Sequence, residues 1–492
     1  MNKEELLKLQ NGSDIRGVAI HIPGKSAPNL TAKAINCIAQ GFLSWVTEKT
    51  GKEPSDIKIA IGRDSRLSGQ AIASEISTAL SCCGCSVYDC GNASTPAMFM
   101  SLIYEQAGFD ASIMITASHL PYERNGMKFF TKEGGLDKGD ITYILEEASL
   151  KEPLYGENNA QNFDLMSLYT DDLCNKIKQG VNHPSDYDHP LSSLKIVVDA
   201  GNGMGGFFAT DILSKLGADI NGSQFLEPDG HFPNHVPNPE DKEAMSYIKE
   251  ATVKSGADLG LIFDTDVDRM SAVLSDGTVI NRDALIAMMA AILAPDNPHS
   301  TIVTDSVTSD RLTDFLENTL SLKHLSFKRG YKNVINKCRQ LNEEGINSPL
   351  AIETSGHGAL KENYYLDDGA YQAVKLVIAL AKSKREGKKL HDLIKDLSTD
   401  YYDMEIRFNI DDEDFASAGA KTLDTFKKNA SAKGYKIPDT FEGVRISIDE
   451  NDLKGWALLR ASLHDPVLVL NAEGRDLSQC EKIVAICKEI MH

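Results

Sequence analysis

The feature that most constrains the fold of this chain is a regular alternation of two kinds of segment along most of its length. Short apolar runs, such as residues 57–61, 111–115 and 259–263, are separated by amphipathic stretches of helical length. Strands that alternate with helices in this way are typical of α/β domains with parallel or mixed sheets. Because 492 residues are too many for one hydrophobic core, we expect three or four domains.

The pattern of apolar and polar residues changes at two places that suggest domain ends. Residues 156–163 are polar and carry no periodic apolar positions. After about Ser398 the alternation gives way to several strand-like segments and two helical ones, over 415–432 and 477–491. The last part of the chain is therefore expected to form a compact α+β domain.

A serine follows one apolar run at a place where ligands bind in α/β sheets. Residues 111–115 predict a buried strand, and Ser118 and His119 come shortly after it. A serine becomes a nucleophile only when a neighbour takes its proton or a metal stabilises its oxygen. His119 and Lys128 are the candidate neighbours. Taken alone, the more ordinary explanation is a serine that caps a turn.

Three aspartates alternate after a second apolar run. Asp264, Asp266 and Asp268 follow residues 259–263, and we expect their side chains to converge along an extended loop. Carboxylate oxygens suit Mg²⁺, and three like charges held close together need a cation to neutralise them. A solvated acidic turn is the ordinary alternative, but it does not require this spacing. We therefore predict a magnesium site.

The same acidic segment has a competing interpretation. Phosphatases of the haloacid-dehalogenase type also place alternating aspartates after a strand and use the first one as nucleophile. Two observations count against that interpretation. Arg269 follows the acidic segment directly and suits a phosphate clamp. Ser118 also offers another place for the phosphoryl group.

Two further polar segments follow apolar runs in the second half of the chain. Glu353 and Ser355 lie on the same side if the backbone is extended, which suits paired sugar hydroxyls. His357 is a candidate proton shuttle. Arg460 and Ser462 also share a side and suit a phosphate group. The ordinary explanations are a polar turn for the first segment and a surface arginine in a strand-turn-strand for the second.

Together, the four segments resemble the motifs of the α-D-phosphohexomutase family, which includes phosphoglucomutases, phosphomannomutases and phosphoglucosamine mutases. The family's marks are a serine loop T-A-S-H-N-P followed by N-G-x-K, a metal loop D-x-D-x-D-R, a sugar loop G-E-x-S-G-H, and a phosphate loop R-x-S-x-T-E-P. All four occur here in the family's order. Segments 12–17, 62–69 and 199–205 match the family as well.

The chain departs from the family pattern at a few positions. Leu120 stands where the family usually has Asn, and Ile352 stands where it usually has Gly. Leu463, His464 and Asp465 replace a small residue, Thr and Glu in the phosphate loop. The serine, the aspartates and the arginine of the metal loop are intact, so we expect the phosphoryl chemistry to be preserved. The altered phosphate loop bears on which sugar or phosphoryl donor is used.

The resemblance implies a role for each candidate residue. Ser118 is expected to carry a phosphoryl group and to bind Mg²⁺ together with Asp264, Asp266 and Asp268. A phosphosugar is the expected substrate, and a hexose 1,6-bisphosphate is the expected intermediate and activator. The remaining roles are catalysis, by Arg16, His119, Lys128, Arg269 and His357, and substrate binding, by Lys332, Glu353, Ser355, Arg460, Ser462 and His464.

The resemblance also implies an architecture. Three similar mixed α/β domains and a smaller C-terminal α+β domain are expected to surround a central cleft. The family's architecture and the two changes in sequence pattern together give the predicted domain boundaries. The four domains are 1–155, which carries the serine loop, 156–280, which carries the metal loop, 281–398, which carries the sugar loop, and 399–492, which carries the phosphate loop.

Composition narrows the expected partners and compartment. A formal charge of −20 argues against nucleic acid, whereas a phosphosugar needs only a local basic funnel. No apolar run reaches the length of a transmembrane helix, and residues 1–10 do not resemble a signal peptide. The nine cysteines show no zinc-type pairing and fit a reducing compartment. We expect a cytoplasmic protein that binds neither nucleic acid nor membrane, and the sequence does not predict its oligomeric state.

The primary hypothesis is a phosphohexomutase that interconverts hexose 1-phosphate and hexose 6-phosphate, with glucose as the expected sugar. An alternative keeps the same chemistry but makes the enzyme a glucose 1,6-bisphosphate synthase, with a donor such as fructose 1,6-bisphosphate. The changes at 463–465 motivate it. A second alternative is a sugar-phosphate sensor without turnover, and the intact serine and metal loops speak against it.

Overall fold

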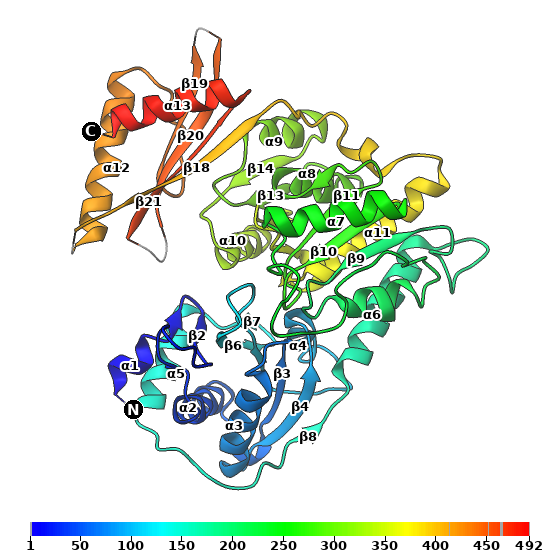
Figure 1. Cartoon of the computed structure of the whole chain (residues 1–492), viewed down its shortest axis with the longest axis vertical. Helices are drawn as coiled ribbons and strands as arrows, with labels where there is room; N and C mark the ends of the chain where they lie inside the picture. Colours follow the sequence, from blue (N-terminus) through cyan, green and yellow to red (C-terminus); the bar gives the residue numbers. More distant parts are fainter. Residues whose placement is uncertain (1, 413, 451, 463–465, 492) are drawn as a thin grey trace. The chain divides into compact units, whose positions relative to one another are not determined.

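The structure is a computed structural model that describes residues 2–412, 414–450, 452–462 and 466–491. These residues group into two compact units. The first contains the chain up to Ile280 together with Leu366–Leu390, and the second contains Asn281–Tyr365 together with the chain from His391 onward. In Figure 1 the first unit runs from blue to green and takes in the yellow helix α11.

The larger sheet of the first unit is mixed. Its strands follow the order β1-β2-β6-β5-β3-β4-β8, and β7 pairs with β6. Strand β3 runs parallel to β4 and β5, whereas β5 and β2 run antiparallel to β6. The strands are β1 Gln10–Asn11, β2 Asp14–Val18, β3 Lys58–Arg63, β4 Ser86–Asn92, β5 Ala111–Ile115, β6 Arg124–Thr131, β7 Gly134–Gly135 and β8 Gln161–Asn162.

Helices cover both faces of this sheet. On one face α2, α3 and α5 pack against Ile59, Ile61 and Ile113 in one continuous core. Ala60 and Met114 are also fully buried, and α4 packs against their strands. Burial of both faces explains why these strands are apolar without alternation. The helices are α1 Lys3–Leu7, α2 Ala32–Thr50, α3 Gly69–Cys82, α4 Thr95–Met100, α5 Lys138–Ser149 and α6 Leu165–Val181.

A second, four-stranded sheet completes the first unit, in the order β12-β11-β10-β9. Its strands are β9 Ile196–Asp199, β10 Leu259–Phe263, β11 Met270–Leu274 and β12 Val279–Ile280, and only β9 and β10 run parallel. Helix α7 (Lys242–Ser255) buries Ile248 and Met245 against this sheet. The short strand β17 (Leu366–Asp367) leads into α11 (Gly369–Arg385), which contacts β10, β11 and α6.

The second unit begins with another α/β layer. Strands β14, β13, β15 and β16 lie in that order, with β13 parallel to both β14 and β15. Val303 and Ala351 of the sheet pack against Val334 and Cys338 of α10. The elements are α8 Arg282–Leu293, β13 Thr301–Thr304, α9 Asp310–Asp314, β14 Lys323–Ser326, α10 Tyr331–Glu343, β15 Leu350–Ile352 and β16 Gly358–Leu360.

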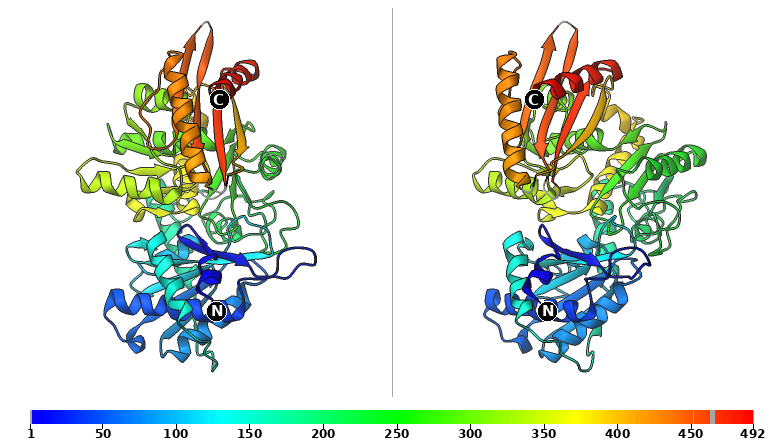
Figure 2. Two further views of the ribbon diagram at one scale, coloured as in Figure 1. Left: turned by 90° about the vertical axis from the view of Figure 1, so that its left-hand side faces the viewer. Right: turned by 60° about the vertical axis from the view of Figure 1, so that its left-hand side comes forward.

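The chain ends in an antiparallel sheet, in the order β18-β21-β20-β19. Two helices bury Phe426 and Ile483 against Ile446 and Leu470 of this sheet, and Figure 2 shows these helices, in orange and red, beside the strands. The elements are β18 Tyr402–Asn409, α12 Phe415–Ala432, β19 Val444–Glu450, β20 Leu453–Ala461, β21 Val467–Gly474 and α13 Leu477–Ile490.

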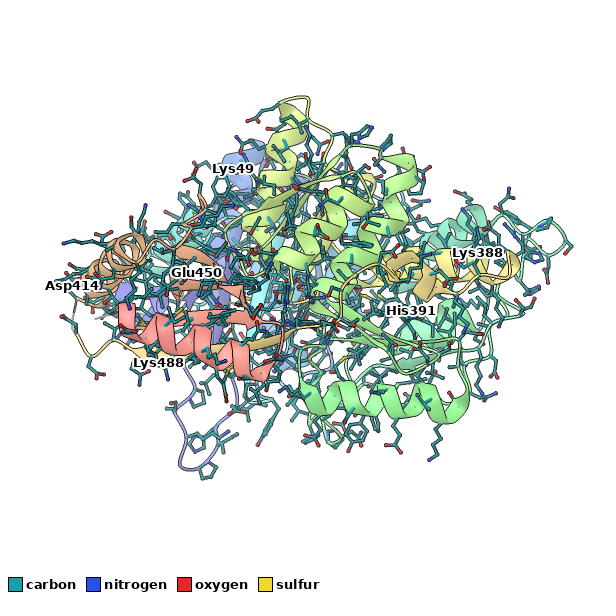
Figure 3. All side chains as sticks on the ribbon, turned by 90° about the horizontal axis from the view of Figure 1, so that it is seen from above. Lys49, Lys388, His391, Asp414, Glu450 and Lys488 are labelled. Atoms are coloured by element: carbon teal, nitrogen blue, oxygen red, sulfur yellow. The ribbon has the colours of Figure 1, made fainter. Side chains whose placement is uncertain are left out.

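The predicted fold class is confirmed, because three α/β domains are followed by one smaller domain built on a single sheet. The four domain boundaries and the central cleft stay predictions. Within the described residues, no helix is long and apolar enough to cross a membrane. Charged side chains such as those labelled in Figure 3 lie exposed on the surface, among them Lys49, Lys388, Asp414, Glu450 and Lys488.

Candidate active site

The serine loop begins where β5 ends. All five residues of β5 are buried, and Thr116 and Ala117 carry the chain on to Ser118. The backbone of Ser118 has a φ of 49°, a left-handed conformation that is uncommon for a residue with a side chain. The N–H of Ser118 donates to Thr116 Oγ1 over 2.9 Å. The chain therefore turns sharply at the serine.

The metal loop contacts the serine within the first unit. Ser118 Oγ donates to Asp264 Oδ2 over 3.1 Å. Asp264, Asp266 and Asp268 are buried, and one carboxylate oxygen of each lies within 4.8 Å of the other two. The segment is a turn and not the extended loop that we expected, since Val267 has a φ of 67° and its N–H donates to Asp264 O. The predicted convergence of the three carboxylates is nevertheless present.

This cluster of carboxylates fits a hard divalent cation. Its ligand atoms are all oxygens, which Mg²⁺ prefers. Asp266 Oδ1 is buried and has no hydrogen-bond partner among the described residues, so it can serve another ligand. Lys128 Nζ lies 3.1 Å from Asp266 Oδ2 and 2.5 Å from Asp268 Oδ2. A single ammonium group offsets only part of the charge of three carboxylates.

Arg269 connects the metal loop with the serine loop. Its guanidinium is 2% exposed and pairs with Asp264 through Nε over 3.2 Å. Its Nη2 lies 3.3 Å from Ser118 Oγ and 2.6 Å from His119 Nδ1. An arginine always donates, so His119 Nδ1 accepts and the ring carries its proton on Nε2. The arginine is thus directed at the hydroxyl oxygen of Ser118.

Arg16 supports the same loop from β2. Its Nη1 donates to Thr116 O over 2.9 Å, and its Nη2 pairs with Asp14 Oδ2 over 2.8 Å. The structure therefore brings together Arg16 and every candidate residue of the serine and metal loops. Those residues, all in the first unit, are Arg16, Ser118, His119, Lys128, Asp264, Asp266, Asp268 and Arg269.

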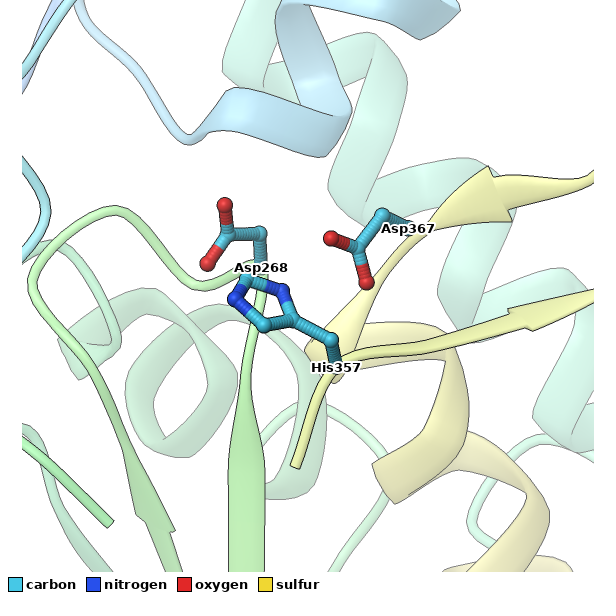
Figure 4. A group of neighbouring side chains, drawn as sticks. All are labelled: Asp268, His357 and Asp367. Carbon is cyan, nitrogen blue, oxygen red and sulfur yellow. The ribbon is translucent and has the colours of Figure 1, made fainter. Parts of the chain in front are cut away.

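A fourth carboxylate, to which no sequence motif pointed, lies near this cluster. Asp367 of β17 is buried, and one of its oxygens lies within 4.8 Å of an oxygen of Asp268 (Figure 4). The next residue, Asp368, caps α11 and accepts from the hydroxyl of Tyr169. Two aspartates before a helical run indicate a helix cap, so the sequence offered no signal for the proximity of Asp367. His357, which Figure 4 also labels, belongs to the second unit and directly precedes β16.

The sugar motif of the second unit forms a tight hairpin. Glu353 N–H donates to His357 O, and Gly356 N–H donates to Glu353 O, so the backbone turns here and is not extended. Ser355 Oγ still approaches Glu353 Oε2 at 3.4 Å, which puts the two side chains on one side. The ring of His357 stacks on Tyr331, with 5.1 Å between the centroids.

Glu353 is an unusual acid in this motif. It is 4% exposed, and its Oε1 accepts from the N–H of Gly330 over 2.6 Å. Burial first, and then the nearby carboxylate of Asp305, raise the pKa of Glu353 to about 7. Asp305 also holds the hairpin, because it accepts from Thr354 Oγ1 over 2.8 Å. The predicted residue Lys332 lies in the first turn of α10 and is half-buried.

The phosphate motif of the second unit presents a buried cation. Arg460 lies near the end of β20 and is 6% exposed, and its Nε has no hydrogen-bond partner among the described residues. Burial and the neighbouring charge of Arg329 lower the pKa of Arg460. Two guanidinium groups close together favour an anion between them. Ser462 N–H donates to Val467 O, whereas His464 and its neighbours 463 and 465 lie outside the described residues.

Models of a known protein family match this chain in sequence order. They are described as Phosphoglucomutase/phosphomannomutase, alpha/beta/alpha domains I, II and III, and they match residues 8–155, 168–277 and 281–401.

Named relatives match along most of the chain. A phosphomannomutase/phosphoglucomutase of Pseudomonas putida is 29% identical over 444 residues, which cover 89% of this chain and 89% of the relative. A phosphoglucomutase/phosphomannomutase of Thermococcus kodakarensis is 30% identical over 419 residues, which cover 85% and 86%. The crystal structure of a phosphoglucomutase/phosphomannomutase family protein from Burkholderia thailandensis matches with a TM-score of 0.79 and 26% identity, and covers 100% of this chain and 97% of that chain.

Proposed function

This chain belongs to the phosphoglucomutase/phosphomannomutase family, and we propose that it interconverts hexose 1-phosphate and hexose 6-phosphate through a phosphorylated Ser118. The observation that carries this proposal is the position of Ser118 Oγ. It lies 3.1 Å from Asp264 Oδ2 of the acidic cluster and 3.3 Å from Arg269 Nη2. A serine in contact with both an oxygen-ligand cluster and a buried guanidinium is suited to phosphoryl transfer.

The family is Mg²⁺-dependent, and Asp264, Asp266 and Asp268 are the residues that would hold the ion together with an oxygen on Ser118. When bound, Mg²⁺ neutralises charge on the transferred group. Arg269 Nη2 donates to the phosphoryl oxygens and stabilises the charge that builds up during transfer. Lys128 Nζ lies within hydrogen-bond distance of Asp266 and Asp268, and its positive charge offsets part of the negative charge of the three carboxylates.

The transfer itself needs one proton to move in each direction. A hydroxyl oxygen of the hexose phosphate attacks the phosphorus of phosphoserine, an O–P bond forms, and the bond from Oγ of Ser118 to phosphorus breaks. The hydroxyl proton goes to a base, Oγ of Ser118 takes up a proton as it leaves, and the product is hexose 1,6-bisphosphate. After the bisphosphate has reversed its orientation, Oγ of Ser118 attacks its other phosphoryl group and gives up its proton. The sugar oxygen that is released takes up a proton. His119, His357 and Lys128 are the proposed proton carriers, because arginines such as Arg16 stay protonated.

The second unit supplies the groups that suit a sugar phosphate. Glu353 and Ser355, paired at 3.4 Å, are proposed to bind two adjacent hydroxyls. Arg460 and Ser462, with Lys332 and His464, are proposed to bind the phosphate that is not being transferred. Hydroxyl-binding and phosphate-binding groups within this unit thus suit the two chemical parts of a hexose phosphate.

The proposed sugar is glucose, and the proposed activator is a hexose 1,6-bisphosphate that restores phosphoserine when the intermediate escapes. The printed names of the relatives include both phosphoglucomutase and phosphomannomutase, so mannose is the second sugar to assay. A glucose 1,6-bisphosphate synthase would use the same residues. The substitutions at 463–465 remain the reason to consider that alternative. A sensor without turnover is disfavoured because the relatives are named as mutases, and because Ser118, the three aspartates and Arg269 are all present.

The direct test of the proposed nucleophile is intact-mass measurement of the purified protein after incubation with Mg²⁺ and glucose 1,6-bisphosphate. The wild type is expected to gain one phosphoryl group, and Ser118→Ala is expected to gain none and to lose mutase turnover. Ser149→Ala is the matched control, because Ser149 lies at the end of α5 and donates only to Glu146 O among its described contacts. Full activity in Ser118→Ala would remove the serine from the scheme.

A further inference from the structure

The loop that carries Ser118 folds around the guanidinium of one arginine, Arg66. Nη1 donates to Pro121 O over 2.9 Å and to Arg124 O over 3.0 Å. Nη2 donates to Leu120 O over 2.6 Å and also to Ser118 O. One side chain from the β3–α3 connection therefore binds four carbonyl oxygens within seven consecutive residues of the serine loop.

The number of donors matches the number of acceptors. The two Nη atoms of an arginine carry four N–H groups in one plane, and each of the four carbonyls receives one of them. Four carbonyl dipoles that point at one place repel each other unless a cation lies between them. Arg66 is 3% exposed, so water is excluded and the guanidinium is the group that satisfies these oxygens.

Arg66 is itself held in place by a buried carboxylate. Asp64 Oδ1 accepts from the backbone N–H of Arg66 over 3.0 Å, and Asp64 Oδ2 lies 3.2 Å from Arg66 Nε. Both side chains are completely inaccessible to solvent. Burial raises the pKa of Asp64, and the positive charge of Arg66 opposes that shift. The ion pair with Asp64 thus holds the positively charged guanidinium of Arg66 at the centre of the serine loop.

A second segment of the first unit packs against this arginine. A Cβ on Gly230 would lie 2.4 Å from Ser65 O and 2.6 Å from Leu67 N, so only glycine fits there. The ring of Phe232 lies over the guanidinium, 5.3 Å from its carbon. Residues 230–232 thus cover Arg66, whose side chain is inaccessible to solvent and has little room for another rotamer.

We propose that Arg66 is a positioning residue, which fixes the 118–124 loop so that Ser118 Oγ faces Asp264 and Arg269. The carbonyl of Ser118 is bound by Arg66 while its backbone keeps the left-handed φ of 49°. The binding of this carbonyl offsets the cost of that conformation and sets the direction of the Cα–Cβ bond. Arg66 thereby orients the nucleophile through the backbone carbonyl of Ser118, without contacting the substrate itself.

This inference rests on the proposed phosphoryl transfer, and it predicts a specific defect. Arg66→Lys keeps the positive charge but has three donors on one atom, so it cannot satisfy four carbonyls in the same plane. A displacement of the reacting atom by about 1 Å costs roughly 100-fold in rate. We expect kcat to fall about 100-fold while KM for the hexose phosphate stays within about threefold, because the substrate-binding residues are unaffected.

The control is Arg63→Lys, since Arg63 lies three residues earlier and pairs with Asp89 over 2.8 Å. Four proteins are compared: wild type, Arg63→Lys, Arg66→Lys and Asp64→Asn. For each, the melting temperature, kcat, KM and the rate at which Ser118 gains phosphate from glucose 1,6-bisphosphate are measured. Hydrogen exchange of the peptide that covers residues 116–126 gives an independent report on the loop.

The expected result is slow phosphorylation of Ser118 and fast exchange of that peptide in Arg66→Lys, together with a lower melting temperature, because buried carbonyl oxygens lose their donors. Arg63→Lys is expected to behave as the wild type. Wild-type rates and exchange in a folded Arg66→Lys would overturn the inference. If Arg66→Lys does not fold, Asp64→Asn decides: a loss of about tenfold in kcat supports the inference, and unchanged kcat rejects it. Absence of phosphoserine in the wild type would instead reject the proposed function.

Discussion

The hydroxyl of Thr95 donates to Asp266 Oδ2 over 2.5 Å, and the N–H of Thr95 donates to Asp266 O over 2.8 Å. The first residue of α4 is thus tied twice to the middle aspartate of the metal loop. Thr95 is 4% exposed, so water does not compete with these bonds. The aspartate that has to direct a free oxygen at a metal is held in place by a residue 171 positions away in the sequence.

Thr95→Val is expected to weaken Mg²⁺ binding. Valine fills the same volume but removes the hydroxyl donor, so Asp266 is less firmly oriented. Loss of such an outer contact typically costs 10- to 100-fold in metal affinity. Titration of mutase activity with Mg²⁺ measures the shift. Thr95→Ser, which keeps the hydroxyl, is the control, and an unchanged Mg²⁺ requirement in Thr95→Val would contradict the assignment.

Arg460→Met is expected to raise KM for the hexose phosphate with a smaller effect on the phosphorylation of Ser118. Arg460 is a buried cation beside Arg329, and an anionic ligand relieves the repulsion between the two. Loss of one charged contact to a phosphate costs about 2–3 kcal/mol, which is roughly 30- to 150-fold in affinity. The control is Arg407→Met, because Arg407 is an exposed arginine of β18 that pairs with Glu405. Equal KM values for the two variants would contradict the proposed phosphate site.

Glu353→Gln is expected to stabilise the second unit at alkaline pH. Burial raises the pKa of Glu353 from 4.5 to about 7, so the folded state holds a proton that the unfolded chain releases. The stabilising effect of this proton is complete below pH 4.5 and is lost as the pH rises through about 7. The variant has no charge to bury, and it should gain up to about 3 kcal/mol over the wild type at pH 8. Denaturant unfolding at pH 5 and at pH 8 measures the free energy of unfolding of both proteins. An equal gain in this free energy at both pH values would contradict the raised pKa of Glu353.

His235→Asn is expected to flatten the pH dependence of stability in the first unit. Burial lowers the pKa of His235, but its hydrogen bonds to Asp199 over 3.0 and 3.1 Å, the negative charge of Asp199 and the bond to Val236 O together outweigh burial, and the net shift is upward. The ion pair stabilises the fold fully below pH 6.5, and this contribution disappears as the pH rises through the folded pKa. Thermal unfolding between pH 6 and pH 9 tests it. A wild type and variant with parallel pH profiles would rule out the ion pair.

Much of the site was predictable because each motif is local. Ser118 and the three aspartates follow buried strands, and a strand end in a mixed α/β sheet is exposed to ligands for topological reasons. The periodic apolar pattern also predicted α12 at the bounds Phe415–Ala432 that the structure has. Where residues that are close together in the sequence make up the candidate site, their spacing is enough to predict it.

The remaining features depend on contacts between distant segments. Asp367, Thr95 and Arg66 reach the site through tertiary packing. The residues around Asp367 and Thr95 in the sequence indicate helix caps, and the family match of segment 62–69 does not by itself show that Arg66 binds the serine loop. The sequence left open whether the sugar motif is extended or forms a polar turn, and Gly356 with a φ of 94° closes it into a hairpin. A glycine inside that motif was the available signal for the turn.

The central claim is that Ser118 passes a phosphoryl group between the two ends of one hexose. The most direct measurement is ³¹P NMR of the protein with Mg²⁺ and glucose 1-phosphate, in one sample with a trace of glucose 1,6-bisphosphate and in another with stoichiometric fructose 1,6-bisphosphate. The account predicts conversion to glucose 6-phosphate in the first sample, and no conversion with Ser118→Ala. Build-up of glucose 1,6-bisphosphate in the second sample with little isomerisation in the first would contradict the mutase and identify a bisphosphate synthase.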